Sequence, residues 1–189
     1  MTFPLKYDCL RTNVYENQEF KIVPIRFEDR LDIMKWRNEQ MYHLRQAEPL
    51  NQKNQDNYFK SIISSLFHQE KPNQILFSFF KNHQLIGYGG LVHINWIDKN
   101  AEISFIMDTK LEKEHFEFYW TQYLNLIEKV AFNELHFHKI FTFAFDLRQH
   151  LYSVFSLAGY KKEARLKDHC CFQDKFIDVV IHSKINNYE

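Results

Sequence analysis

The chain has 189 residues, and its 24 basic and 24 acidic side chains give a formal net charge of zero. Balanced charge argues against nucleic acid or a membrane surface as a partner, because binders of either are normally basic. The length predicts a single domain over residues 1–189, and three cysteines without a disulfide framework indicate a reduced, cytoplasmic setting.

The predicted elements alternate in an order typical of a mixed α/β protein. Residues 1–18 alternate weakly and are predicted to be an N-terminal extension that adds a strand or an arm. Apolar residues at helical spacing predict helices at residues 27–37, 52–68, 112–135 and 148–157. Apolar runs between turn residues predict strands at residues 19–26, 75–80, 139–145, 160–172 and 176–185, and a hairpin at residues 84–107. This order predicts a mixed, mainly antiparallel sheet flanked by helices.

The hairpin at residues 84–107 holds three of the four glycines of the chain. Glycine inside a strand usually marks a bulge or a close approach of another backbone. Residues 98–100 (DKN) read as the turn, and the second arm carries one carboxylate, Glu102, among apolar residues. We therefore expect a binding surface on this hairpin.

Glu102 is the candidate general base, because the deprotonation of an amine needs a carboxylate or an imidazole close to it. A structural ion pair with Arg26 or Arg37 is the competing interpretation of this glutamate. His93, on the first arm of the hairpin, is the second catalytic candidate. A histidine in a strand is more often a hydrogen-bonded packing residue, and that interpretation also stays open.

Aromatic and polar residues around the hairpin and at the end of the first helix are candidate substrate contacts. They are Trp36, Arg37, Asn38, Tyr88, Asn95 and Trp96. The three hairpin residues could stack on a sugar and hydrogen-bond to it, while the guanidinium of Arg37 suits a phosphate or a carboxylate. Core packing, cross-strand pairing and a structural ion pair are the alternatives. The spacing of His136, His138 and His169 with the two cysteines after it matches no standard zinc pattern, so we expect no metal.

Three motifs in order resemble the GNAT superfamily of acetyl-CoA-dependent N-acetyltransferases over about residues 19–185. They are Ile25-Arg26 with Trp36-Arg37-Asn38, residues 86–91 (IGYGGL) leading to residues 101–107 (AEISFIM), and residues 158–164 (AGYKKEA). The resemblance is nearest to members that modify amino sugars or ribosomal proteins. It implies direct transfer of acetyl from acetyl-CoA to a primary amine of a small molecule, such as an amino sugar or a sugar nucleotide, and it allows a homodimer. The alternative is a non-catalytic binding or assembly module that has lost acetyl-CoA.

The resemblance also implies a place for acetyl-CoA. The pantetheine arm would lie between two splayed strands, against Phe105, Ile106 and Met107, and the diphosphate at the start of the next helix. There the glycine-rich family pattern is replaced by residues 112–117 (EKEHFE), whose glutamates would repel a phosphate. The remaining cofactor candidates are Lys113, His115, Phe116 and Arg148, together with Phe155 in the place of the usual general-acid tyrosine.

Overall fold

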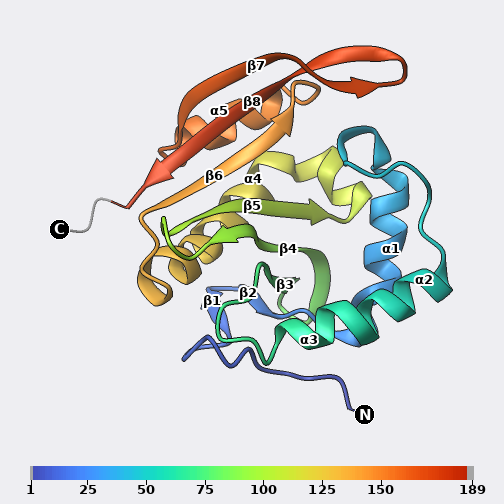
Figure 1. Cartoon of the computed structure of the whole chain (residues 1–189), viewed down its shortest axis with the longest axis vertical. Helices are drawn as coiled ribbons and strands as arrows, with labels where there is room; N and C mark the ends of the chain where they lie inside the picture. The colour runs from blue at the N-terminus through green and yellow to red at the C-terminus, as the bar shows by residue number, and fades with distance from the viewer. Residues whose placement is uncertain (1, 187–189) are drawn as a thin grey trace.

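The computed structural model describes residues 2–186, so Met1 and residues 187–189 of the predicted domain lie outside the described residues. Eight strands form one sheet in the order β1-β2-β3-β4-β5-β6-β8-β7 (Figure 1). Their bounds are β1 (Tyr15–Asn17), β2 (Phe20–Pro24), β3 (Ile75–Lys81), β4 (Gln84–Asn95), β5 (Asn100–Met107), β6 (Lys139–Phe145), β7 (Lys161–Phe172) and β8 (Lys175–Ile185). Neighbouring strands are antiparallel except for β5 and β6, which are parallel.

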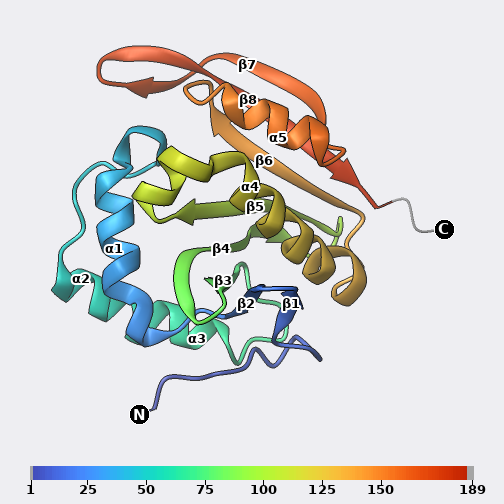
Figure 2. The same cartoon turned by 180° about the vertical axis from the view of Figure 1, so that it is seen from behind.

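Helices flank this sheet, which confirms the predicted mixed α/β class. The helices are α1 (Arg30–Glu39), α2 (Gln52–Asn57), α3 (Ser64–Leu66), α4 (Thr109–Glu128) and α5 (His150–Leu157). A π-helical stretch (Tyr58–Ile63) joins α2 to α3, and a second one (Lys129–Glu134) follows α4. Short 3-10 turns occur at Phe27–Asp29 and Met41–His43. Helices α4 and α5 lie together on one face of the sheet (Figure 2). None of the described helices combines the length and the apolar character needed to cross a membrane.

Three helix starts differ from the sequence prediction. Helix α1 begins at Arg30, because the first residues of the predicted helix form a 3-10 turn at Phe27–Asp29. Helix α4 begins at Thr109 rather than at residue 112, because the Asp108 carboxylate accepts the backbone N–H of Lys110 and acts as an N-cap. Helix α5 begins at His150, two residues after the predicted start at Arg148. Arg148 therefore lies in the connection between β6 and α5.

The N-terminal extension packs into the molecule. The side chain of Tyr7 is buried, and its hydroxyl accepts the N–H of Leu76 at 3.0 Å and donates to the carbonyl of the same residue at 3.1 Å. Its ring stacks on Phe67 at 4.1 Å. Further along, β1 adds a short strand to the edge of β2. The extension thus supplies both an arm and a strand.

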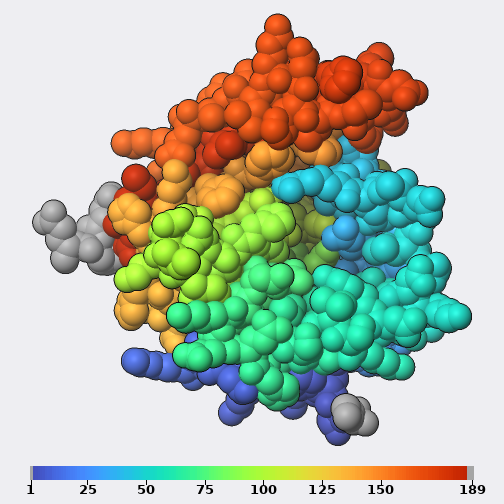
Figure 3. Space-filling model, viewed as in Figure 1, coloured from blue at the N-terminus to red at the C-terminus, as the bar shows by residue number. Residues whose placement is uncertain are grey.

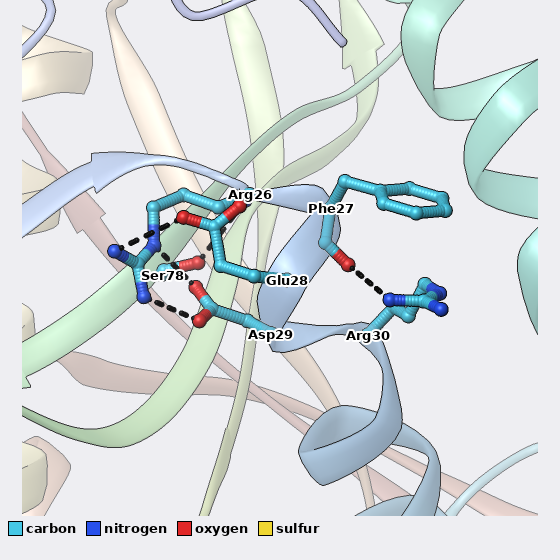
Figure 4. A network of polar contacts seen from close by, with 6 residues as sticks. All are labelled: Arg26, Phe27, Glu28, Asp29, Arg30 and Ser78. Atoms are coloured by element: carbon cyan, nitrogen blue, oxygen red, sulfur yellow. Dashed lines mark hydrogen bonds and ion pairs between the residues drawn. The ribbon is translucent and has the colours of Figure 1, made fainter.

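The start of α1 is held by a network of charged side chains (Figure 4). Arg26 donates from Nε to Asp29 Oδ2 at 2.8 Å, and its Nη1 lies 3.3 Å from Glu28 Oε1. The backbone N–H of Arg26 donates to the Ser78 hydroxyl on β3. Arg26 is therefore engaged far from β5, and it is not the partner of Glu102 that the sequence suggested.

Strands β5 and β6 pair only along their first residues. The register runs from Asn100 opposite Lys139 to Glu102 opposite Phe141, and the described residues beyond Glu102 form no further β5–β6 pairs. Parallel neighbours that stop pairing must separate, because the backbone groups between them find other partners. The separation opens a gap directly after Glu102.

A glycine lets helix α4 pack closely against β5. The Tyr123 hydroxyl of α4 donates to the Ser104 carbonyl of β5 at 2.9 Å. A Cβ on Gly89 of β4 would overlap both that carbonyl and that hydroxyl. The ring of Tyr123 also stacks on Phe105 at 3.9 Å. The close approach predicted from the hairpin glycines therefore exists, and it fixes α4 against β5.

Candidate active site

A cavity of about 430 Å³ occupies the gap between β5 and β6. Its walls come from β4, β5, β6, α4, α5 and residues 43–45, which follow α1. In Figure 3 the surface is hollowed between the light-blue segment after α1 and the yellow-green atoms of β4 and β5. The predicted site residues that line this cavity, called here the central cavity, are Arg37, His93, Glu102, Phe105, Ile106, Arg148 and Phe155.

The two catalytic candidates meet at the edge of the central cavity. Glu102 is buried, with 9% of its surface exposed, and its Oε2 lies 2.7 Å from Nδ1 of His93. The β4–β5 register shifts between Val92 and Asn95, and His93 has a φ of 49°. This bulge removes His93 from the regular alternation of the strand and turns it toward Glu102. The imidazole is 64% exposed, so the pair joins a buried carboxylate to solvent.

Sequence reasoning missed the other partner of Glu102. Nη2 of Arg45 donates to Glu102 Oε1 at 2.9 Å, and the guanidinium lies 4.5 Å from the centre of the Phe143 ring on β6. Arg45 belongs to a segment that the sequence predicts only as a loop. The sequence shows that Arg45 is a cation, but the residues of a loop have no periodic pattern that would predict which strand residue they contact. The structure therefore replaces Arg26 and Arg37 with Arg45 as the cation on Glu102.

A second histidine, also missed, lines the central cavity. Nε2 of His43 lies 3.2 Å from Gln40 Oε1. Burial, together with the positive charge of Arg148, lowers the pKa of His43 to about 3. This imidazole is therefore neutral throughout the physiological pH range.

Arg37 stands where the central cavity meets a second one of about 400 Å³, called here the side cavity. Its Nη1 donates to the Tyr88 hydroxyl at 2.8 Å and its Nε donates to Gln46 Oε1 at 3.0 Å. Interaction with Tyr88 raises the pKa of Arg37, while burial raises the pKa of Tyr88. Of the predicted substrate contacts, Arg37 and Tyr88 are thus brought together by α1 and β4.

At the α4 end of the central cavity the charges are already paired. Nη1 of Arg148 lies 3.2 Å from Glu112 Oε1, and both side chains are nearly buried. Burial lowers the pKa of Arg148, although Glu112 opposes that shift. The N-terminus of α4 is capped by Asp108, and His115 interrupts the helix with φ −140° and ψ 34°. An anion at this end must displace Glu112 from Arg148.

Four predicted substrate contacts have structural partners and line neither cavity. Trp36 is buried in the core. The carboxamide of Asn38 bonds both the N–H and the carbonyl of Leu50, and that of Asn95 closes its own turn. The indole of Trp96 donates to a backbone carbonyl at 2.8 Å. These four predicted contacts therefore lie outside the two cavities.

The predicted cofactor residues divide in the same way. Phe105, Ile106, Arg148 and Phe155 line the central cavity. Met107 does not, and its backbone carbonyl accepts a hydrogen bond from the side chain of Gln40, the residue after α1. The other three predicted residues lie on the first turns of α4, outside the central cavity, where Lys113 and His115 are exposed and Phe116 is buried beside Arg148. Lys113 and Phe116 line a separate hollow of about 450 Å³ with Glu112.

Solved structures share this fold. The spermidine N-acetyltransferase from Vibrio cholerae in complex with CoA and spermine is 18% identical, covers 90% of this chain and 97% of its own, and gives a TM-score of 0.77. A dodecameric structure of the Vibrio cholerae enzyme is 17% identical over 90% of this chain and 95% of its own, with a TM-score of 0.73. A putative acetyltransferase is 12% identical over 93% and 87%, with a TM-score of 0.68. A search of curated proteins gives no match.

A model of the acetyltransferase (GNAT) domain matches residues 22–181. This range contains the hairpin, the central cavity and all of the predicted site residues. The match confirms the family expected from the three motifs, and with it the predicted acyltransferase and acetyl-CoA as its co-substrate. The chain belongs to the GNAT acetyltransferase family.

Proposed function

We propose that the protein acetylates a primary amine of a small molecule, with Glu102 as the general base and His93 as the route by which the proton leaves. The observation that carries this role is the 2.7 Å contact between a buried carboxylate and an exposed imidazole at the edge of the central cavity. A base must be within hydrogen-bond reach of the proton that it removes, and it must be able to pass that proton on.

The reaction needs two deprotonations of the incoming ammonium. Glu102 takes the first proton, and the neutral nitrogen attacks the thioester carbonyl carbon, so that a C–N bond forms while the C–S bond breaks. The second proton follows the same path through His93 to solvent. Phe155 has no proton to give, so we assign the proton that neutralises the leaving thiolate to water.

The gap between β5 and β6 suits the extended part of acetyl-CoA, which supplies the acetyl group as a thioester. Residues 103–106 of β5 and 142–145 of β6 line this gap, and Phe155 closes its base. The diphosphate end fits less simply, because Arg148 is held by Glu112. We assign Arg148 to the phosphates once Glu112 has been displaced, since the guanidinium can hold a phosphate through charge-assisted hydrogen bonds.

An amino sugar or a sugar nucleotide remains our proposed acceptor. The similar Vibrio cholerae protein was solved with spermine, but at 18% identity the likeness extends to the fold alone. Tyr88 and Arg37 in the side cavity support a hydroxyl-bearing acceptor better than a chain of ammonium groups. We also keep the homodimer and the cytoplasmic location as proposals.

The decisive measurement is thiol release from acetyl-CoA in the presence of a panel of primary amines, with mass spectrometry of the products. An N-acetylated product formed only with acceptor present would support the proposal. Binding of acetyl-CoA without transfer to any amine would favour the non-catalytic module. Calorimetry with acetyl-CoA and CoA separates that case from a chain that binds neither.

A further inference from the structure

We propose that the acceptor carries a carboxylate or phosphate group, and that Arg37 binds this anion at the junction of the central and side cavities. The inference rests on the proposed function and narrows its substrate class. It starts from the three arginines that line the central cavity. Arg45 is paired with Glu102 and Arg148 with Glu112, whereas no described carboxylate pairs with Arg37.

Arg37 is partly buried and its two hydrogen-bond partners are neutral. Nε and Nη1 donate to Gln46 and Tyr88, and no described residue accepts a hydrogen bond from Nη2. A guanidinium withdrawn from water without a counter-ion is costly, and such a charge is normally paired or bound to a ligand. Its planar fork matches a carboxylate or a phosphate in two-point contact. The missing partner of Arg37 is therefore best supplied by the substrate.

The side cavity excludes the opposite class of acceptor. Among the residues that line it, Arg37 is the only charged one. The other residues that line it are apolar or neutral polar ones. A polyamine whose first nitrogen reached Glu102 would place its next ammonium beside an arginine with no carboxylate to receive it. Like charges in a site of low dielectric repel strongly.

A single acceptor molecule can then occupy both cavities. The amine lies at Glu102 in the central cavity, the anion contacts Arg37, and a neutral body occupies the side cavity between Tyr58 and Tyr88. Arg37, Gln74, Val92 and Ser104 line both cavities, so the two form adjoining parts of one site.

Matched amines test this assignment. We would compare kcat/KM for glucosamine 6-phosphate against glucosamine, and for 4-aminobutanoate against butylamine and 1,4-diaminobutane. The anionic member of at least one set is expected to be preferred by about tenfold or more, and the set that shows the preference tells phosphate from carboxylate. Arg37→Gln should raise KM for that amine by about ten- to a hundredfold, so that the preference for the anionic member over its neutral counterpart is largely lost.

Two variants serve as controls. Lys35→Gln removes an exposed cation from the same helix and should leave the preference intact. Arg37→Lys keeps the charge but loses the fork, so it should retain part of the preference. Thermal melting of each variant checks that it is folded, because Arg37 also bonds Tyr88 and Gln46.

The outcomes separate the inference from the function on which it rests. Efficient acetylation of diamines, or a preference for anions that survives Arg37→Gln, would overturn the inference and leave the acetyltransferase standing. If no amine is acetylated, calorimetry with glucosamine 6-phosphate and 4-aminobutanoate decides. Binding that is lost in Arg37→Gln supports the anion subsite, and its absence in the parent protein refutes it.

Discussion

The imidazole of His93 and the carboxylate of Glu102 lie 2.7 Å apart because the backbone at His93 is left-handed. In a regular strand, side chains alternate between the two faces, and Val92 rather than His93 stands opposite Glu102. The bulge overrides this alternation at one residue. A local irregularity of β4 therefore creates the catalytic pair that we propose.

The substitution Glu102→Gln should lower kcat by roughly 10²–10⁴-fold, because a general base acts in the transition state. Affinity for acetyl-CoA should change little. The folding cost should be modest, since Arg45 is 49% exposed and can turn to water when its partner is lost. Steady-state kinetics, calorimetry and melting curves would measure the three quantities. Unchanged turnover would remove Glu102 from the mechanism and leave His93 as the base.

Two substitutions at His93 distinguish the role of its imidazole in catalysis from the effect of its backbone conformation on stability. Both His93→Ala and His93→Gly remove the imidazole, so both should lower kcat by a similar factor. The alanine variant should be less stable than the glycine variant by about 1 kcal/mol, because a left-handed φ is strained for residues with a Cβ. Urea unfolding and kinetics on the same preparations test this. Equal stabilities would contradict the left-handed conformation, and unequal turnover would show that strain reaches the site.

Opposite effects are expected from the two members of the Arg148–Glu112 pair. Arg148→Ala should weaken CoA by about ten- to a hundredfold and pantetheine, which lacks the diphosphate, hardly at all. Glu112→Gln should tighten CoA, because the phosphates no longer compete with a carboxylate for Arg148. Calorimetry measures both ligands.

Two lysines on the same helix complete that series. Lys113→Ala should resemble Arg148→Ala if its side chain shares the phosphates, and the exposed Lys110→Ala is the matched control. Parent-like binding in both Arg148→Ala and Glu112→Gln would show that the phosphates lie elsewhere.

Acid should destabilise the protein partly through His43. Its pKa is about 3 in the folded chain against an ordinary value of 6.5, so between these values the unfolded chain binds a proton that the folded chain does not. The free energy of unfolding therefore falls as the pH drops from about 6.5 toward 3. His43→Gln should make this dependence shallower, as seen by urea unfolding at neutral pH and near pH 4.5. Burial also lowers the pKa of His182, so the free energy of unfolding of His43→Gln should still fall somewhat as the pH drops. An unchanged slope would contradict the burial of His43.

The strands and helices could be predicted because their signals are local. Residues 139–145 form the predicted strand without a shift, and the helix predicted at residues 112–135 packs against the sheet through Tyr123. One boundary that failed, the start of α4, depends on side-chain capping. Asp108 starts α4 early because a carboxylate captured a backbone N–H, which spacing alone does not reveal.

The site could be predicted only in part, because its contacts join distant segments. Residue type and position on the hairpin or the first helix predict Glu102, His93 and Arg37 as candidates, and all three line the central cavity. Arg45 was not predicted, since 57 residues separate it from the carboxylate that it binds. Trp96, a candidate that lines neither cavity, donates its indole N–H to a backbone carbonyl. Sequence patterns do not distinguish that use of an indole from a role in ligand binding.

The contact of Arg45 with Glu102 has a consequence for the order of events. An acceptor ammonium must take Oε1 of Glu102 from a guanidinium that also rests on the Phe143 ring. Residues 41–47 face the tip of the β7–β8 hairpin across a hollow of about 650 Å³, so the displaced Arg45 has room to move. In the absence of substrate, Arg45 thus occupies the position on Glu102 that the acceptor ammonium needs. An amine that binds too weakly to displace Arg45 does not reach the general base.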